Sequence, residues 1–305
     1  MFLCCKNQIY NLVKTYKRLI NMKKLLLAFY SLSIVISAHA QVMTPQPSTS
    51  SKLEQTIGMT DVSVTYSRPR VKGRKIFGDL VPFDKMWRTG ANKNTVFTFQ
   101  HDVRIDGKPL KAGSYALYTV PSDGNWEFIF YSDSENRGLP KNWDDSKVAL
   151  RFSKKVNNKL RNTVEAFSIV INVQSDDRAF IALSWENTFA GFTVKVPTDK
   201  LVQQSISSTL NSDGAKSKDY YAAAVYYLNA EKDIAKAEEW MDTAMSMTDN
   251  PKFWQLRQQS LIYAAAGKTK EAIKTAKKSL ASAQKAGNAD YVKLNEDSLK
   301  AWGAM

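Results

Sequence analysis

The pattern of apolar and polar positions divides the chain into two regions of different periodicity. Between residues 53 and 197, short runs of β-branched and aromatic residues alternate with polar positions and end at turn residues. This period of two is typical of β-strands. From residue 198 onward, apolar residues recur three and four positions apart, which is typical of amphipathic helices. The pattern therefore predicts a β domain (53–197) followed by a helical domain (198–305).

Nine runs in the first region fit short strands, and two of them end at clear turn signals. Asp106-Gly107 is a typical hairpin turn, and Pro121–Gly124 is a second turn. The predicted strands cover residues 62–67, 95–100, 103–106, 114–120, 126–131, 147–156, 163–173, 179–185 and 192–196. Eight to ten short strands with no helix between them predict a β-sandwich of the jelly-roll type, with a small barrel as the alternative. Residues 41–52, QVMTPQPSTSSK, are rich in Pro, Ser and Thr and predict a flexible leader.

The second region predicts a helix over 199–210, capped by Thr198 or Asp199, followed by two similar units. The units span about 218–252 and 253–287 and align with a shift of 35 positions, which pairs Val225 with Ser260 and Ala237 with Ala272. Each unit predicts two antiparallel helices, and a further helix at 288–302 would cap the array. This organisation resembles the tetratricopeptide repeat, whose period is about 34 residues.

The helical domain also predicts a protein partner. Stacked helix pairs usually present a concave surface to a peptide or a partner helix. The array is unusually rich in aromatic residues, most of which we expect in its core: Tyr221, Tyr226, Tyr227, Trp240, Trp254 and Tyr263. Those left exposed on the inner face would form an interaction site.

Residues 1–40 fit a cleaved export signal. A positive start at Met22–Lys24 precedes an apolar run over 25–37, and Ala38-His39-Ala40 supplies a cleavage site before Gln41. The apolar run is shorter than the roughly 20 residues that span a bilayer, so a membrane anchor is the less favoured alternative. Met22 would be the true start of translation, or residues 1–21 would form a long n-region. We expect a periplasmic or secreted protein with no membrane span after cleavage.

Cleavage after Ala40 changes the chemistry that the chain offers. It removes Cys4, Cys5, His39 and six basic residues but no acid, so the formal net charge falls from +14 to +8. His101 is then the only histidine and no cysteine remains. These counts exclude a disulfide framework, a thiol nucleophile and a multi-histidine metal site, so we expect no metal or cofactor. The pI of about 9.5 is high, but no nucleic-acid-binding motif is present and we expect no nucleic-acid partner.

The stretch SRPRVKGRK, Ser67–Lys75, holds five basic residues and no acid. In an extended chain, four of them would share one face: Arg68, Arg70, Lys72 and Arg74. A row of guanidinium groups suits carboxylate, sulfate or phosphate. Two alternatives stay open. Pro69 and the lysines suit a protected edge strand, or the cations pair with acids, for which there are three candidates: Asp79, Asp84 and Glu165.

The segment MWRTGANKNT, Met86–Thr95, has the composition of a polar-ligand pocket. Trp87 could stack on a sugar ring while Arg88 and Asn92 bind its polar edge. Alternatively, Trp87 plugs the end of the sandwich and Arg88 satisfies loop carbonyls. The candidate site for an anionic or sugar-like ligand is therefore Arg68, Arg70, Arg74, Trp87, Arg88 and Asn92.

Four residues are weaker acid or base candidates: Asp144, Asp145, Glu165 and His101. Two carboxylates placed across a cleft would suit a glycan hydrolase, but spacing along the chain does not show such a pair. The chain contains no D-x-D-x-D-G calcium loop, G-x-S-x-G elbow, phosphate loop or dinucleotide fingerprint.

Two segments, GRKIFGDLVPFDKMWRTGANKNT (Gly73–Thr95) and DGKPLKAGSYALYTVPSDGNWEFIFY (Asp106–Tyr131), resemble the domain of unknown function family 2911. The resemblance covers residues 50–197. Members of that family are exported proteins, chiefly from Bacteroidota, and a helical repeat often follows their β-rich domain. The resemblance implies export and a β-rich fold, and it implies no established activity.

The sequence thus predicts an exported, non-enzymatic binding or scaffold protein. Its β-sandwich would hold an anionic or sugar-like ligand, and its helical tail would dock a protein partner. The alternatives are an envelope glycan hydrolase and a purely structural envelope protein.

Overall fold

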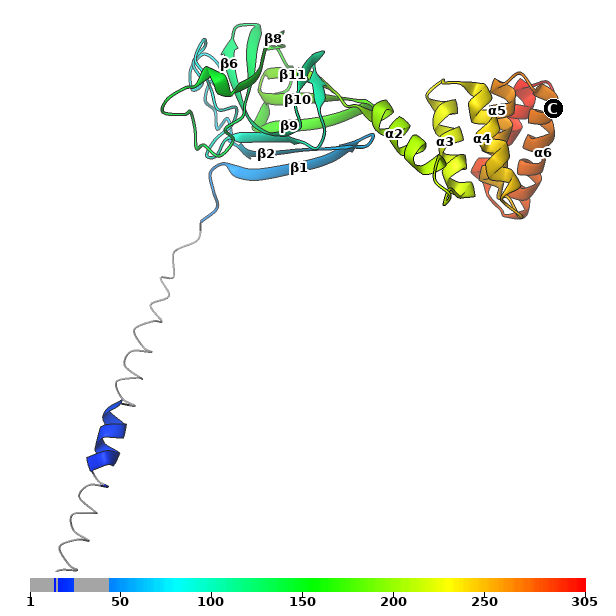
Figure 1. Cartoon of the computed structure of the whole chain (residues 1–305). Coiled ribbons are helices and arrows are strands. Elements are labelled where there is room, and N and C mark those ends of the chain that lie inside the picture. The colour runs from blue at the N-terminus through cyan, green and yellow to red at the C-terminus, as the bar shows by residue number, and fades with distance from the viewer. Residues whose placement is uncertain (1–13, 15, 25–43) are drawn as a thin grey trace, which may run out of the picture. The chain divides into compact units, whose positions relative to one another are not determined.

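The computed structural model describes residues 14, 16–24 and 44–305 of the chain. The predicted signal peptide, residues 1–40, falls mainly on residues outside this described part, including its cleavage site. No helix among the described residues is both long and apolar enough to cross a membrane. Residues Ser48–Met305 form one compact unit, whose course is traced in Figure 1.

Two antiparallel sheets make up the β domain, which confirms the predicted β-rich fold with its two packed sheets. The jelly-roll description stays a prediction. The first sheet has the order β1 (Thr49–Ile57), β2 (Thr60–Arg68), β3 (Thr95–Phe99), β6 (Gly113–Ser122), β7 (Asn125–Tyr131), β8 (Val148–Lys155). The second has the order β5 (Lys108–Leu110), β4 (Val103–Ile105), β11 (Thr188–Lys195), β10 (Arg178–Glu186), β9 (Val164–Ser175). The Asp106-Gly107 turn joins β4 to β5 with φ angles of 46° and 83°, as the hairpin prediction requires.

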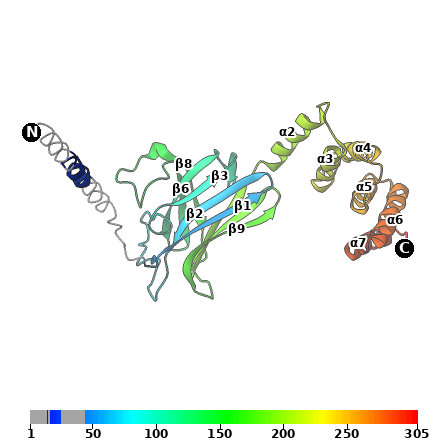
Figure 2. The same ribbon diagram turned by 90° about the horizontal axis from the view of Figure 1, so that it is seen from below.

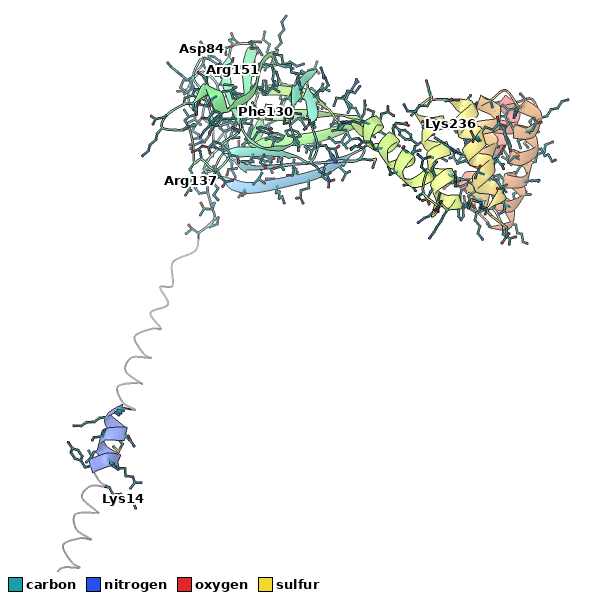
Figure 3. The ribbon with its side chains drawn as sticks, in the orientation of Figure 1. Lys14, Asp84, Phe130, Arg137, Arg151 and Lys236 are labelled. Atoms are coloured by element: carbon teal, nitrogen blue, oxygen red, sulfur yellow. The ribbon has the colours of Figure 1, made fainter. Side chains whose placement is uncertain are left out.

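Phenylalanine side chains from both sheets fill the space between them. The ring centroid of Phe192 on β11 lies 6.0 Å from that of Phe97 on β3 and 5.6 Å from that of Phe130 on β7. Phe130 is fully buried and is marked within the β domain in Figure 3. Burying one such ring stabilises the fold by about 1.5–3 kcal/mol. The inward positions of the alternating strands therefore supply the core, as their period of two predicts.

Strand β1 corrects the predicted leader. Residues 49–52 were expected in a flexible segment ending at residue 52, but Thr49–Ile57 pairs along its whole length with β2. Only Ile57 of this strand is buried, and Leu53 is half-buried against the core. The polar run TSSK (49–52) has no alternating apolar residues. It forms a strand because its backbone hydrogen-bonds to β2.

We therefore expect truncation to distinguish the leader from the strand. A chain that begins at Ser48 should unfold at the same temperature as one that begins at Gln41. A chain that begins at Leu53 loses the ladder of residues 49–52 and should be less stable by about 2–4 kcal/mol, at roughly 1 kcal/mol per hydrogen bond. Thermal unfolding of the three chains, followed by circular dichroism, measures the difference. Equal midpoints for all three would contradict a stabilising role for the start of β1.

Six helices form the rest of the unit. They are α2 (Thr198–Leu210), α3 (Ser217–Asn229), α4 (Ile234–Ser246), α5 (Phe253–Ala265), α6 (Thr269–Lys285) and α7 (Ala289–Ala301). From α3 to α7, each helix packs on the next in chain order, and α5 also packs on α3 and α7. Figure 2 shows this succession from a second direction.

The predicted cap of α2 is wrong. Pro197 occupies the N-cap position, and no side chain caps the helix there. The Thr198 hydroxyl instead donates to the carbonyl of Asp176 in the β9–β10 hairpin, at 2.6 Å. Gly58 (φ 56°) leaves room for this contact, because a Cβ on Gly58 would lie 2.1 Å from the Thr198 oxygen. The Thr198 side chain therefore ties the helix to the β domain and is not free to cap it.

The predicted 35-residue shift holds for the second helix of each unit. Helices α4 and α6 begin 35 residues apart, and the small side chains of Ala237 and Ala272 are fully buried at corresponding positions. The first helices, α3 and α5, begin 36 residues apart. The fully buried Ala224 therefore corresponds to the fully buried Ser260, so the predicted pairing of Val225 with Ser260 is wrong by one residue.

The difference between the two shifts lies in the connections between helices. Four residues join α3 to α4, whereas three join α5 to α6. Gly267 has φ 75° in the shorter connection, as expected for the turn that it was predicted to close, and Glu231 has φ 51° in the longer one. Glycine suits this left-handed conformation because it has no Cβ.

Candidate functional site

The basic stretch SRPRVKGRK joins the two sheets along one side of the domain. Strand β2 ends at Arg68, and the next residues lie along the edge strand β9. The amide of Phe167 donates to the carbonyl of Pro69 at 2.9 Å, and the amide of Val71 donates to the carbonyl of Glu165 at 2.7 Å. Pro69 offers only a carbonyl, which is the group that this pairing uses. The contacts agree with the edge-strand alternative.

The four basic residues do not share one strand face. Lys72 and Gly73 have φ angles of 50° and 72° and form a turn, so the extended backbone stops before Arg74. The expectation of a single face from Arg68 to Arg74 was conditional on an extended chain and is not met.

Backbone carbonyls engage two of these arginines. Arg68 donates from Nε to the carbonyl of Phe167 at 3.0 Å and from Nη2 to the hydroxyl of Ser168 at 2.7 Å. Arg74 donates from Nε to the carbonyl of Val71 at 3.0 Å and from Nη2 to the carbonyl of Arg70 at 2.5 Å. Both side chains thus donate to groups of the chain close to where it passes from β2 to β9, and the Val71 carbonyl also accepts from the amide of Arg74. The side chain of Arg70 is exposed.

Trp87 packs into the end of the sandwich. Its ring stacks on Trp185 with centroids 5.7 Å apart and meets Trp126 and Phe167 edge to face. Its Nε1 donates to the carbonyl of Gly90 at 3.2 Å, and its backbone pairs with Thr119 of β6. These contacts agree with the plug alternative and leave little of the ring for a sugar.

Asn92 and Arg88 organise the loop that follows Trp87. Asn92 has φ 57° and donates from Nδ2 to the carbonyl of Ser48 at 3.2 Å and to the Ser67 hydroxyl at 3.4 Å, which ties the start of β1 to the end of β2. Arg88 is half-buried and donates once, at 3.5 Å, to the carbonyl of Asn92. Apart from the exposed Arg70, Arg88 therefore has the most unused donors of the predicted site. Its hydrogen bond stabilises the loop after Trp87, whereas those of Arg74 stabilise the turn at Lys72-Gly73.

The acid and base candidates each have a local partner. Asp144 accepts from the Ser146 hydroxyl at 2.6 Å and from the Ser146 amide at 3.0 Å, at the start of the short helix η1 (Asp145–Lys147), and these hydrogen bonds lower its pKa. Asp145 accepts from the indole of Trp143 at 2.8 Å. Glu165 accepts from the amide of Lys72 at 3.1 Å, and His101 Nδ1 lies 3.2 Å from the Thr60 hydroxyl. A lowered pKa is the opposite of what a general acid needs.

No metal site emerges from these acids. Over residues 14, 16–24 and 44–305, no group of three or more His, Cys, Asp or Glu side chains is placed to hold a metal ion.

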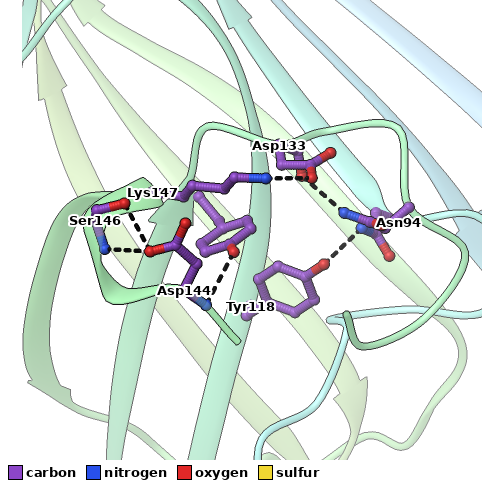
Figure 4. A network of polar contacts seen from close by, with 8 residues as sticks. Asn94, Tyr118, Asp133, Asp144, Ser146 and Lys147 are labelled. Atoms are coloured by element: carbon purple, nitrogen blue, oxygen red, sulfur yellow. Dashed lines mark hydrogen bonds and ion pairs between the residues drawn. The ribbon is translucent and has the colours of Figure 1, made fainter. Parts of the chain in front are cut away.

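A polar network that the sequence did not reveal anchors the long loop 132–147 (Figure 4). Asn94 donates from Nδ2 to the Tyr118 hydroxyl at 2.7 Å and accepts from the amide of Gly138 at 3.1 Å. Lys147 pairs with Asp133 at 3.0 Å, and Trp143 stacks on Tyr131 with ring centroids 4.5 Å apart. Burial raises the pKa of Tyr118 to about 12.

This network covers the outer face of the first sheet. Tyr118 and Tyr131 point away from the main core, yet both are buried, together with Ala116 and Ile129. A strand that is covered on both faces has apolar residues at consecutive positions and not only at alternate ones. Strands β6 and β7 have this pattern, which is the sequence signal that could have predicted the covered outer face.

The helical domain offers a different cluster, formed by α3, α5 and α7. We group four of its residues under the name α3–α5–α7 face: Tyr221, Trp254, Arg257 and Tyr291. Tyr291 lies near enough to Tyr221 and Arg257 to influence the pKa of each. Trp254 and Arg257 lie three residues apart on α5 and so share one side of that helix. Trp254 is 42% exposed. Phe253 contacts Trp254 and Tyr291, with ring centroids 4.9 Å and 4.8 Å apart, and so joins the N-terminal ends of α5 and α7.

Arg257 carries an unpaired charge within this face. Its Nη1 donates to the Asn295 side-chain carbonyl at 3.4 Å and to the Ser298 hydroxyl at 3.2 Å, both on α7. Among the described residues it makes no ion pair; the nearby Asp297 is paired with Lys293 at 2.7 Å. Burial lowers the pKa of Arg257, and burial beside Tyr291 raises the pKa of Tyr221 to about 12.

The other aromatic residues of the array serve its packing. Trp240 is buried against Tyr227, with ring centroids 4.7 Å apart. The hydroxyl of Tyr226 donates to Asp199, and that of Tyr263 donates to Asp242. Of the six aromatic residues, Trp240 belongs to the core and Tyr221 and Tyr227 pack against it. Tyr226 and Tyr263 lie outside this core and Trp254 is exposed, so the expectation that most of the six are core is met by three of them.

Comparison with known proteins gives one match. Residues 48–194 match the family described as Protein of unknown function (DUF2911), which supports the resemblance found in the sequence. The matched segment begins at β1 and ends within β11, so it contains the β domain and excludes the helices. No curated protein and no solved structure matches the chain.

Arg68 and Arg70, which lie where the chain passes from β2 to β9, should differ in their effect on stability. Arg68→Ala removes the hydrogen bonds to Phe167 and Ser168 and should lower the free energy of unfolding by about 1–3 kcal/mol. Arg70→Ala removes an exposed side chain and should change it by less than about 0.5 kcal/mol. Denaturant unfolding of both variants measures the difference. Equal effects would mean that the contacts of Arg68 contribute nothing beyond its charge.

Proposed function

We propose that this chain is an exported binding or scaffold protein in which the helical domain docks a protein partner. The β domain would act as a rigid platform for it. One observation carries the proposal: the α3–α5–α7 face combines a partly exposed tryptophan with a half-buried arginine that has no acid partner among the described residues.

The repeat organisation supports this role. The helices from α3 to α7 follow one another as packed pairs, with small buried residues at matching positions of the two units. This is the arrangement expected of a tetratricopeptide-like array with α7 as its capping helix. In such an array the first helix of each pair contributes to a common binding surface. Helices α3 and α5 are those helices here, and the capping helix α7 follows them on the other side of α5.

The chemistry of the face favours a partner segment that carries a carboxylate. Tryptophan and arginine are the residue types that most often dominate the binding energy of protein interfaces. A guanidinium that is partly removed from water and not paired with an acid gains most from a charged acceptor. Arg257 keeps donors beyond its two bonds to α7, and it lies one helical turn from Trp254.

The expected interaction can be tested by photo-crosslinking in cells. A photo-reactive amino acid at Lys218, an exposed residue one turn before Tyr221 on α3, should form a discrete crosslinked product. The same amino acid at the exposed Met247, which follows α4, serves as the matched control and should form none. Arg257→Gln and Trp254→Ala should each reduce the product about tenfold, which corresponds to about 1.4 kcal/mol of binding.

The stability of the variants has to be checked beside the crosslinks. Arg257→Gln keeps a donor for Asn295 and Ser298, and so it should leave the helical circular dichroism unchanged. Equal crosslinking from Lys218 and Met247, or a product that survives both substitutions, would refute docking at this face.

Arg88 supports a second candidate, an anionic ligand on the β domain. Its guanidinium is half-buried and makes one long hydrogen bond among the described residues. The other members of the predicted ligand site have contacts that explain them as parts of the architecture, apart from the exposed Arg70. The hydrolase alternative finds less support, because Asp144 has a lowered pKa and Asp145 and Glu165 are engaged by neighbouring groups.

A further inference from the structure

The outer side of helix α6 carries a row of lysines. Five exposed lysines lie along this helix: Lys270, Lys274, Lys277, Lys278 and Lys285. At 3.6 residues per turn they fall within an arc of about 100°, and over fifteen residues they extend for about 22 Å. We call this arc the lysine row. Glu271 lies at its margin and is the one acid of α6.

The lysine row points away from the neighbouring helices. The buried residues of α6 lie on the opposite side of the helix, and they are all small: Ala272, Thr275, Ala276, Ser279 and Ala283. Within the described part of the chain, none of the five lysines takes part in an ion pair. The charge on this side of α6 (orange in Figure 1) is therefore directed at solvent and is left uncompensated.

We propose that the lysine row binds the surface of a membrane that contains anionic lipids. This inference is independent of the docking role of the α3–α5–α7 face. Lysine is a flexible point charge, suited to many mobile headgroup phosphates, whereas a defined phosphate or carboxylate pocket favours the bidentate fork of arginine. Basic residues on one side of an amphipathic helix are attracted to anionic bilayers, with a gain that accumulates from each charge.

The composition of the row argues against the other polyanionic partners. Its arc contains no arginine and no aromatic side chain. It therefore lacks the groups that most often hydrogen-bond to the base edges of duplex DNA or stack on the bases of single strands. Protein interfaces have apolar centres from which lysine is depleted, and the only apolar side chain in this arc is Ala281. A diffuse anionic surface fits these features best.

Vesicle sedimentation tests the proposal. The chain from Gln41 onward includes the whole compact unit Ser48–Met305 and omits the apolar run of residues 25–37. It should sediment with vesicles of phosphatidylcholine containing about 30% phosphatidylglycerol and not with pure phosphatidylcholine. Binding should weaken as salt is raised, because screening shortens the reach of exposed charges.

A matched pair of triple variants separates the lysine row from net charge. Lys274→Gln, Lys277→Gln and Lys278→Gln together should reduce vesicle affinity about a hundredfold, at roughly fivefold per lysine. The control replaces three exposed lysines of the β domain, Lys93, Lys155 and Lys159, by glutamine and should change the affinity by less than about fivefold. Lysine and glutamine have similar helix propensities, so circular dichroism should confirm that α6 is intact.

Several outcomes would overturn the proposal. The first is no sedimentation with the anionic vesicles, and the second is equal loss in both triple variants, which would indicate attraction by net charge alone. A third outcome is seen with two soluble probes, duplex DNA and a polyglutamate peptide. Binding to either probe that depends on the lysine row, without binding to vesicles, would assign the row to that class of partner instead. Photo-crosslinking at Lys218 reports separately on the protein partner, so either function can fail without the other.

Discussion

The free edge of strand β9 is the constraint on which the β domain depends. An open sheet edge exposes unpaired amides and carbonyls, which favour pairing with other chains. In this protein the chain that leaves β2 crosses to that edge and pairs with residues 165–167 through its own backbone. Arg68 adds two side-chain bonds to the same edge. The crossing therefore closes one side of the sandwich and fixes the distance between the two sheets there.

This closure accounts for the contacts of Arg68 and Arg74 within the basic stretch. The cations of SRPRVKGRK stand where a proline and a tight turn carry the chain between sheets, and arginine has enough donors to satisfy the carbonyls left open there. Beneath the crossing, Trp87 packs on Trp126 and Trp185. The indole nitrogen of Trp185 is buried without a hydrogen-bond partner among the described residues. Dense aromatic packing thus takes precedence there over the pairing of one polar group.

Both interaction surfaces that we propose as primary belong to the helical domain. The α3–α5–α7 face combines aromatic area with one unpaired guanidinium, which suits a specific protein segment. The lysine row of α6 has charge without aromatic or apolar area, which suits a diffuse anionic surface. If both proposals hold, the protein is a scaffold that brings a protein partner close to a membrane.

The sequence by itself determined the class of each domain, because strand and helix periods are local properties of the chain. It located nine of the eleven strands, the Asp106-Gly107 hairpin and every helix of the array. The start of β1 escaped detection because its polar residues form a strand only when β2 is beside them. The roles of Arg68, Trp87 and Arg257 also depended on tertiary structure. Whether a guanidinium meets a carbonyl, a carboxylate or water depends on residues far away in the chain: Phe167 for Arg68, and Asn295 and Ser298 for Arg257.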